Sequence, residues 1–136
     1  MILRVNRSQL DLLREESRKC FPIEACALLF GSMTDREAVV KKIVIAPNVL
    51  RSTVRFGIEP QTLAKAIAQA NEEGLEIIGL FHSHPALATP SGVDLQYMRF
   101  WSDAIWLILS STGGSMAAFQ MIRGEAREVA IEVEDA

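Results

Sequence analysis

Short apolar segments that end at turn-forming residues constrain this fold more than any other feature of the sequence. Three of them are "EACALLFG", "LEIIGLFHSH" and "AIWLILSS", and each is far too short to cross a bilayer as a helix. Apolar runs of this length are typical of buried strands, because helices are marked by longer, periodic patterns. The chain therefore builds its core around a β-sheet.

The other segments predict two or three helices and the remaining strands. Ser8 caps the first helix, and Pro22 prevents its extension. Leu10, Leu12 and Leu13 lie on its inner side. This order predicts a mostly antiparallel, curved sheet flanked by helices, an α+β fold with α/β layers. The predicted strands are 2–5, 24–31, 36–48, 75–84, 104–111, 116–124 and 127–134, the predicted helices are 8–19, 59–73 and 91–101, and 49–58 is an edge strand or an extended loop.

The composition is that of one globular domain over residues 1–136. Hydrophobic residues make up 49% and charged residues 23%, which allows a core without disulfide staples. The net charge of -3 gives no support for a nucleic-acid partner. The charged N-terminal segment lacks the apolar core of a signal peptide, so we expect a soluble, cytoplasmic protein with no membrane partner. Cys20 and Cys26 do not have zinc-knuckle spacing and are interpreted as buried or half-buried thiols.

Aromatic side chains gather at the end of the third predicted helix and in the strand that follows it. We assign Phe100, Trp101 and Trp106 to the core, because large aromatic side chains are mostly buried. The alternative is that these residues form a homodimer surface together with Leu107 and Leu109.

Both histidines of the chain lie at the end of the strand predicted at 75–84. Side chains two positions apart on a strand point to the same side, so His82 and His84 project together while Ser83 faces away. Two imidazoles on one side can hold one metal ion. The alternative interpretation is a polar strand end that faces solvent.

A third metal ligand must be Asp or Glu, because the chain has no further histidine. Asp94 is the nearest acid after His84, and the turn from Pro85 to Pro90 brings the chain back toward the histidines. Ser91 and Asp94 also match a capping box, so these two residues could cap a helix and do nothing else. The dipole of that helix would keep the carboxylate ionised, which suits a metal ligand.

Three protein ligands leave a fourth tetrahedral position for water, which is typical of catalytic rather than structural zinc. Imidazole and carboxylate ligands suit Zn²⁺ without excluding other first-row metals. A zinc hydrolase also needs a general base, and Glu24 is the one charge in the stretch "FPIEACALLF". On a strand, the Glu24 side chain would lie on the face that is directed into the core. A buried carboxylate there needs a polar partner, and a zinc-bound water would be one. The alternative is that Glu24 lies at an exposed strand end.

The order Glu24, then "HSHP", then "PSGVD" resembles the JAMM family of zinc metalloproteases, also called MPN-plus or JAB. The flanking segments "PIEACALLFG" and "PNVLRSTVRFGIEPQTLAKAIAQANEEGLEIIGLFHSHP" are similar to the corresponding segments of that family. The resemblance covers roughly 12–109, most of the chain. It implies the MPN fold, which is cytidine-deaminase-like, and a minimal, single-domain member of the kind found in archaea and bacteria.

The resemblance also implies a role for each residue of the motif. His82, His84 and Asp94 match the ligands of one Zn²⁺ ion. Glu24 matches the general base, and Ser91 matches the hydroxyl that stabilises the oxyanion. The chain departs from the familiar motif in one place, because six residues rather than seven separate His84 from Ser91.

Members of this family cleave isopeptide bonds to ubiquitin or ubiquitin-like modifiers, just after a C-terminal Gly-Gly. The substrate tail must arrive extended, and we expect it to pair with the segment that contains Val54, Arg55 and Phe56. An ordinary sheet edge or surface loop is the alternative for this segment. Two other functions stay open, namely processing the C-terminus of a sulfur-carrier protein and acting as a scaffold subunit without metal.

Overall fold

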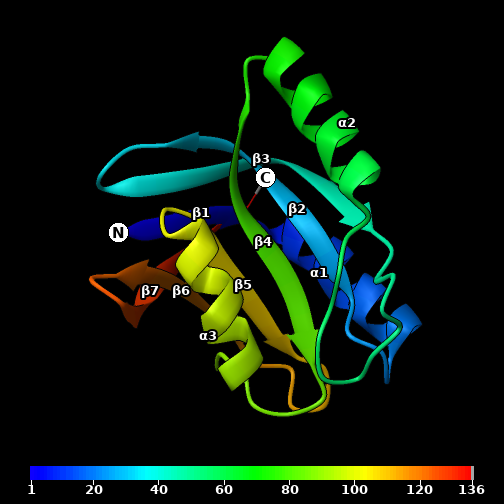
Figure 1. Ribbon diagram of the computed structural model, residues 1–136. Coiled ribbons are helices and arrows are strands. Elements are labelled where there is room, and N and C mark those ends of the chain that lie inside the picture. Colours follow the sequence, from blue (N-terminus) through cyan, green and yellow to red (C-terminus); the bar gives the residue numbers. More distant parts are fainter. Residues whose placement is uncertain (136) are drawn as a thin grey trace.

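The computed structural model describes residues 1–135, in which seven strands close into a barrel with three α-helices around it (Figure 1). The predicted strands and helices are all present, with small differences at their ends. No helix in this range is long and apolar enough to cross a membrane. The strands are β1 (Ile2–Asn6), β2 (Cys26–Met33), β3 (Glu37–Ala46), β4 (Glu76–His84), β5 (Ile105–Ser110), β6 (Met116–Ile122) and β7 (Glu125–Glu134), and the helices are α1 (Arg7–Cys20), α2 (Pro60–Glu72) and α3 (Gly92–Met98), the last continuing into a 3₁₀ turn at Arg99–Trp101.

The prediction of a mostly antiparallel, curved sheet is wrong, because the sheet is a closed barrel of mixed pairing in the order β1-β3-β2-β4-β5-β6-β7. The pairs β1–β3, β1–β7 and β4–β5 are parallel, and the other four pairs within residues 1–135 are antiparallel. The β4–β5 pair is parallel because α3 carries the chain back to the start of the sheet. The β1–β7 pair sets Ile2 opposite Ala130, and no local pattern marks so distant a contact. The mixture of helices and strands is as predicted.

Strands β2, β4 and β5 lie in the middle of the structure and are covered on both faces. One face packs with α1 in a core that includes Leu13 and Phe81. The opposite face packs with α2 and α3 around Trp106. A Cβ atom at Gly79 would lie 2.1 Å from the carbonyl oxygen of Ile105, so glycine allows β4 and β5 to approach closely. The carboxyl end of β4 is consequently buried from both sides.

Three local predictions need correction. Asn6 rather than Ser8 caps α1, because Asn6 Oδ1 accepts from the Gln9 amide at 2.8 Å and Gln9 Oε1 accepts from the Asn6 amide at 2.9 Å. Leu12 is 44% exposed rather than inward-facing. Phe100, assigned to the core, is 84% exposed, because it lies in the short 3₁₀ turn after α3.

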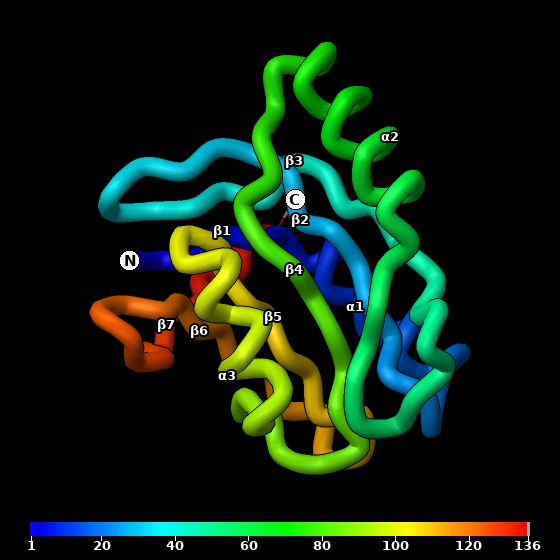
Figure 2. The backbone as a smooth tube through the Cα atoms, viewed as in Figure 1, coloured from blue at the N-terminus to red at the C-terminus, as the bar shows by residue number. Residues whose placement is uncertain are grey.

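The connection between β3 and α2, residues 47–59, is a loop and not an edge strand. Figure 2 shows it leaving the end of β3, passing the carboxyl end of β4 and then rising into α2. We call this segment the β3–α2 loop. Its path brings it to the place where the two histidines lie.

Candidate active site

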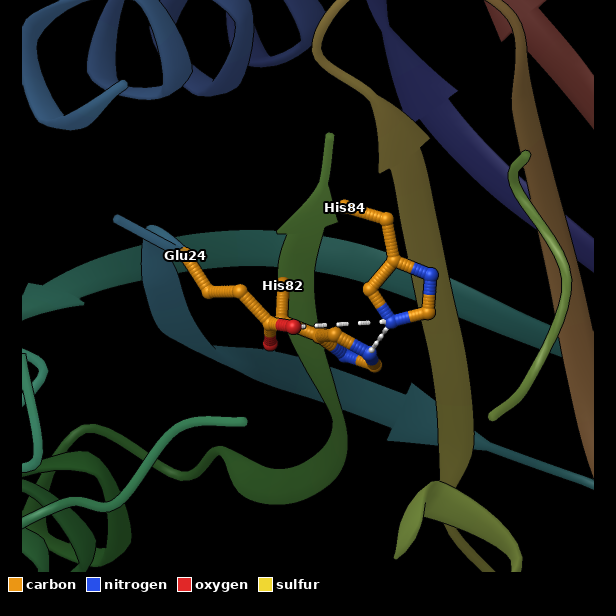
Figure 3. Close-up of side chains that lie close together, drawn as sticks. All are labelled: Glu24, His82 and His84. Carbon is orange, nitrogen blue, oxygen red and sulfur yellow. Dashed lines mark hydrogen bonds and ion pairs between the residues drawn. The ribbon is translucent and has the colours of Figure 1, made fainter. Parts of the chain in front are cut away.

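The two histidines lie side by side at the carboxyl end of β4, as the strand alternation predicted. His82 is fully buried and His84 is 6% exposed, because β2 and β5 flank β4. Their Nε2 atoms are 3.0 Å apart. Figure 3 shows the two rings and the Glu24 carboxylate pointing toward one another. The alternative of a strand end facing solvent is therefore wrong.

The capping box of α3 brings Asp94 to the histidines. Ser91 Oγ accepts from the Asp94 amide at 3.1 Å, and Asp94 Oδ2 accepts from the Ser91 amide at 2.9 Å. The same Oδ2 atom lies 3.0 Å from the Nε2 atoms of both His82 and His84. Helix capping and contact with the histidines therefore occur together. In the six-residue connection between His84 and Ser91, the Leu87 carbonyl accepts a hydrogen bond from His84 Nδ1 at 3.2 Å.

The two Nε2 atoms and Asp94 Oδ2 form a triangle whose three edges are each 3.0 Å. Hydrogen bonds on all three edges would need a proton on each nitrogen directed at the carboxylate and a third proton between the nitrogens. An imidazole nitrogen carries at most one hydrogen, so no protonation state satisfies all three edges. A cation bound to the three atoms removes this conflict.

The size of the triangle also suits a metal ion. In a tetrahedral zinc site with ligands at about 2.0–2.1 Å, the ligand atoms are about 3.3–3.4 Å apart. The 3.0 Å edges need only a small outward movement of the side chains to reach that spacing. The donor set of His82, His84 and Asp94 therefore fits a tetrahedral metal ion.

Glu24 reaches this triangle from just before β2. It is 1% exposed, and its Oε2 atom lies 3.8 Å from His84 Nε2. The possible ligand atoms of Glu24, His82 and His84 lie within 4.8 Å of one another, but Asp94 approaches both nitrogens more closely. Asp94 therefore completes the triangle and Glu24 stands beside it. The alternative of an exposed strand end for Glu24 is wrong.

The protonation of Glu24 is affected by its burial. Burial raises its pKa to about 7, and the neighbouring Asp94 carboxylate also raises it, while His84 opposes the shift. Among residues 1–135, no donor is hydrogen-bonded to Glu24 Oε1. The carboxylate is therefore free to accept a proton near neutral pH.

Among the three candidate ligand residues, the pKa shifts of His82 and Asp94 favour metal binding, whereas that of His84 opposes it. Burial lowers the pKa of His82, although its hydrogen bond to Asp94 opposes this. Burial acts to raise the pKa of Asp94, but hydrogen bonds from His82 and His84 outweigh it and lower the pKa overall. Burial acts to lower the pKa of His84, but the carboxylates of Asp94 and Glu24 raise it overall. A neutral His82 and an ionised Asp94 are the forms that bind a metal ion.

Ser83, between the two histidines, was predicted only to face away from them. Its Oγ accepts from the Ala25 amide at 2.8 Å, and its own amide donates to the Ala25 carbonyl at 3.0 Å. The residue after Glu24 is thereby fixed to the strand that carries the histidines. The sequence did contain a signal for this contact, because Ser83 places a hydroxyl on a buried face of the strand and a buried hydroxyl needs a hydrogen-bond partner. Local patterns did not identify that partner as Ala25.

Phe56 is the one of the three predicted substrate-binding residues that contacts the histidines. Its ring stacks on His82, with centroids 4.8 Å apart and an interplanar angle of 24°. Val54 and Arg55 are exposed on the β3–α2 loop and have no ladder partner within the described residues. The segment 54–56 therefore lies beside the site as a loop.

An apolar cavity of about 410 Å³ adjoins the site on the side of Phe56 and Trp106. These two rings also approach His82, with centroids 4.8 and 6.0 Å away. The cavity therefore lies directly beside His82. It is lined by Val49, Leu50, Phe56, Gly57, Ile58, Leu63, Leu80, Tyr97, Trp101 and Trp106.

Residues 6–122 match the model of a protein family described as prokaryotic homologs of the JAB domain. This span contains every residue of the candidate site and all of β2, β3, β4, β5 and β6.

Two curated relatives and one solved structure are also similar to this chain. It is 39% identical to the desampylase of Pyrococcus furiosus over 82% of this chain and 77% of that protein. It is 29% identical to the probable TtuB-protein conjugate cleaving protease of Thermus thermophilus, over 86% of this chain and 82% of that protein. The solution structure of protein DSY2949 from Desulfitobacterium hafniense superposes with a TM-score of 0.84 at 25% identity, covering 100% of this chain and 94% of that one.

Proposed function

The chain belongs to the family of prokaryotic homologs of the JAB domain, and on that premise we propose that it is a zinc-dependent isopeptidase. It hydrolyses the bond between the C-terminal Gly-Gly of a ubiquitin-like modifier and a lysine of the conjugated protein. The proposal rests on the triangle of His82, His84 and Asp94 with the Glu24 carboxylate beside it. The names of two relatives, desampylase and probable TtuB-protein conjugate cleaving protease, support a substrate of this class.

His82, His84 and Asp94 hold one Zn²⁺ ion in this proposal. Two imidazole nitrogens and one carboxylate oxygen are ligands of the kind found in catalytic zinc sites. When bound, the ion supplies Lewis acidity toward a water molecule and the substrate carbonyl. The protein contributes a buried, preformed arrangement of ligands, since all three side chains are at most 8% exposed.

Glu24 serves first as general base and then as general acid. Its carboxylate takes one proton from the water whose oxygen forms the new bond to the carbonyl carbon. It returns that proton to the lysine nitrogen as the carbon–nitrogen bond breaks, so the products are a free modifier C-terminus and a free amine. Burial acts to raise the pKa of the Glu24 carboxyl, which helps it to hold the proton between the two steps.

Ser91 donates a hydrogen bond to the carbonyl oxygen as negative charge develops on it. Its Oγ lone pair already accepts from the Asp94 amide at 3.1 Å, which leaves the hydroxyl hydrogen to donate. The capping box therefore orients the oxyanion donor and the third metal ligand together.

The substrate tail is proposed to lie along the β3–α2 loop. A Gly-Gly end offers no side chains, so its main chain has to be bound by groups of the protein near Glu24. Val54 and Arg55 are exposed there, and Phe56 lies between the histidines and the apolar cavity. The cavity would then accept an apolar side chain of the tail farther from the cleaved bond.

Metal analysis combined with a cleavage assay tests this proposal. We expect about one zinc per chain, and cleavage of a lysine-linked modifier conjugate that a chelator abolishes and added zinc restores. Cleavage of a C-terminally extended sulfur carrier without cleavage of the conjugate would replace isopeptidase activity by carrier processing. Absence of metal, with no effect of chelator, would favour a scaffold subunit.

The same proposal treats residues 1–136 as one catalytic domain that acts in the cytoplasm. Five residues from three segments of the chain form the proposed site, namely Glu24 before β2, His82 and His84 at the end of β4, and Ser91 and Asp94 at the start of α3. Sedimentation analysis at working concentration distinguishes a monomer from a homodimer.

A further inference from the structure

The main chain of Glu24 is not held by the strand ladder, because β2 begins only at Cys26. Two hydrogen bonds from the β3–α2 loop hold it instead. The Glu24 amide donates to the Ser52 carbonyl at 2.9 Å, and the Glu24 carbonyl accepts from Asn48 Nδ2 at 3.0 Å. The loop therefore binds both polar main-chain groups of the proposed general base.

The side chain of Asn48 organises this loop. Its Oδ1 accepts from the amides of Leu50 and Gly57, each at 3.1 Å. Its Nδ2 donates to the carbonyls of Glu24 and Arg55 at 3.0 and 3.1 Å. An amide group is the side chain that offers two acceptor sites and two donors from so short a stem. An aspartate would keep the acceptors and lose both donors.

The other end of the same loop contacts a metal-ligand residue. Asn48 accepts from Gly57, and the adjacent Val49 amide donates to the Gly57 carbonyl at 2.9 Å, which closes the loop at its base. The residue before Gly57 is Phe56, whose ring stacks on His82. A single side chain thus joins the segment that carries Glu24 to the segment that covers His82.

We propose that Asn48 is a positioning residue that sets the distance between the Glu24 carboxylate and the metal ligands. This inference rests on the proposed function for its catalytic consequence. Asn48 does not touch the reacting atoms and acts through the main chain of Glu24. Proton transfer depends on hydrogen-bond reach, and a displacement of about 1 Å can cost about 100-fold in rate.

The variant Asn48→Asp tests the proposal, because it keeps the shape and the acceptors while placing an oxygen against the Glu24 and Arg55 carbonyls. We expect kcat to fall about 10- to 100-fold, with the zinc content unchanged, since no metal ligand lies on the loop. The control is Asn71→Asp, which makes the same substitution on the exposed surface of α2 and should leave kcat unchanged.

A double substitution separates positioning from general stabilisation. If Asn48 acts through Glu24, then adding Asn48→Asp to Glu24→Gln lowers the residual kcat by less than about 3-fold. An equal loss in both backgrounds would show that Asn48 supports the fold without positioning the base, and would overturn the proposal.

Amide hydrogen exchange decides the same question without any substrate. In Asn48→Asp, the amide of Glu24 should exchange at least about 10-fold faster than in the unsubstituted protein, while those of β4 and β5 keep their rates. Unchanged exchange at Glu24 would overturn the proposal. Failure of the unsubstituted protein to cleave any conjugate would overturn the proposed function instead, and the exchange result would still stand.

Discussion

The proposed metal ligands and the proposed general base are held in two different ways. His82, His84 and Asp94 lie on a central strand and on the capped first turn of a helix, where regular main-chain bonding fixes them. Glu24 lies before its strand and depends on hydrogen bonds from the β3–α2 loop. Metal binding should therefore be robust to changes in the loop, whereas turnover should not.

Loss of a ligand should have the largest effect. In Asp94→Asn, the side chain can still accept from the Ser91 amide, but the negative charge facing the two histidines is lost. We expect metal affinity and turnover each to fall more than about 100-fold, because replacement of even an outer-shell partner costs about 10- to 100-fold. Metal titration and circular dichroism check this, with the exposed Asp103→Asn as control. Full zinc retention would exclude Asp94 as a ligand.

Removal of the base should affect turnover alone. In Glu24→Gln, the buried side chain keeps its shape but cannot take a proton. We expect kcat to fall by about 100-fold or more with zinc content unchanged. Steady-state kinetics with parallel metal analysis measures both, and Glu72→Gln on the surface of α2 is the control. Normal turnover by the Glu24 variant would contradict the assignment of Glu24 as the general base.

Ser83 lies on the strand of two proposed metal ligands but contacts the segment of the proposed base, so its replacement tests how the two parts of the site are connected. Ser83→Ala leaves the buried Ala25 amide without its acceptor at 2.8 Å. We expect the free energy of unfolding to fall by about 1–3 kcal/mol and kcat to fall about 10-fold. Urea denaturation and kinetics test this, with Ser115→Ala at an exposed turn as control. A loss of stability with kcat intact would limit Ser83 to a structural role.

The smallest effect is expected where the loop covers a ligand. Phe56→Leu keeps an apolar side chain but removes the ring stacked on His82. Such aromatic pairs contribute about 0.5–1.5 kcal/mol beyond their buried area, so kcat/KM should fall about 2- to 12-fold with zinc retained. The matched control is Phe100→Leu, since that ring is 84% exposed. Zinc loss in the Phe56 variant would mean that loop and metal site are not independent.

The part of the site that sequence predicts is the part with local patterns. Alternation along β4 places His82 and His84 on one side, and the spacing of Ser91 and Asp94 marks the cap of α3. The contacts of Asn48 join groups that are neither periodic nor adjacent in the chain. They are set by the folded path of the loop, and local sequence rules do not describe it.

In the fold, too, features set by local sequence patterns were predicted and features set by contacts between distant segments were not. Local sequence patterns predicted each strand, but pairing depends on contacts between distant segments, so the parallel β1–β7 pair and the closure of the barrel were missed. At the start of α1, both Asn6 and Ser8 are suitable caps, and Gln9 decides in favour of Asn6 by returning a hydrogen bond. Phe100 was misplaced because a hydrophobic side chain in a short turn need not face the core.

Closure of the barrel has a consequence for how other chains can meet this one. Among residues 1–135, every strand has a neighbour on both sides, so no strand is exposed along its whole length as a template, although β1 pairs with only Glu37–Val39 of β3. This protects the molecule from edge-to-edge aggregation. We therefore expect an extended peptide to find its main-chain partners in a loop, where side chains can vary without disturbing the barrel.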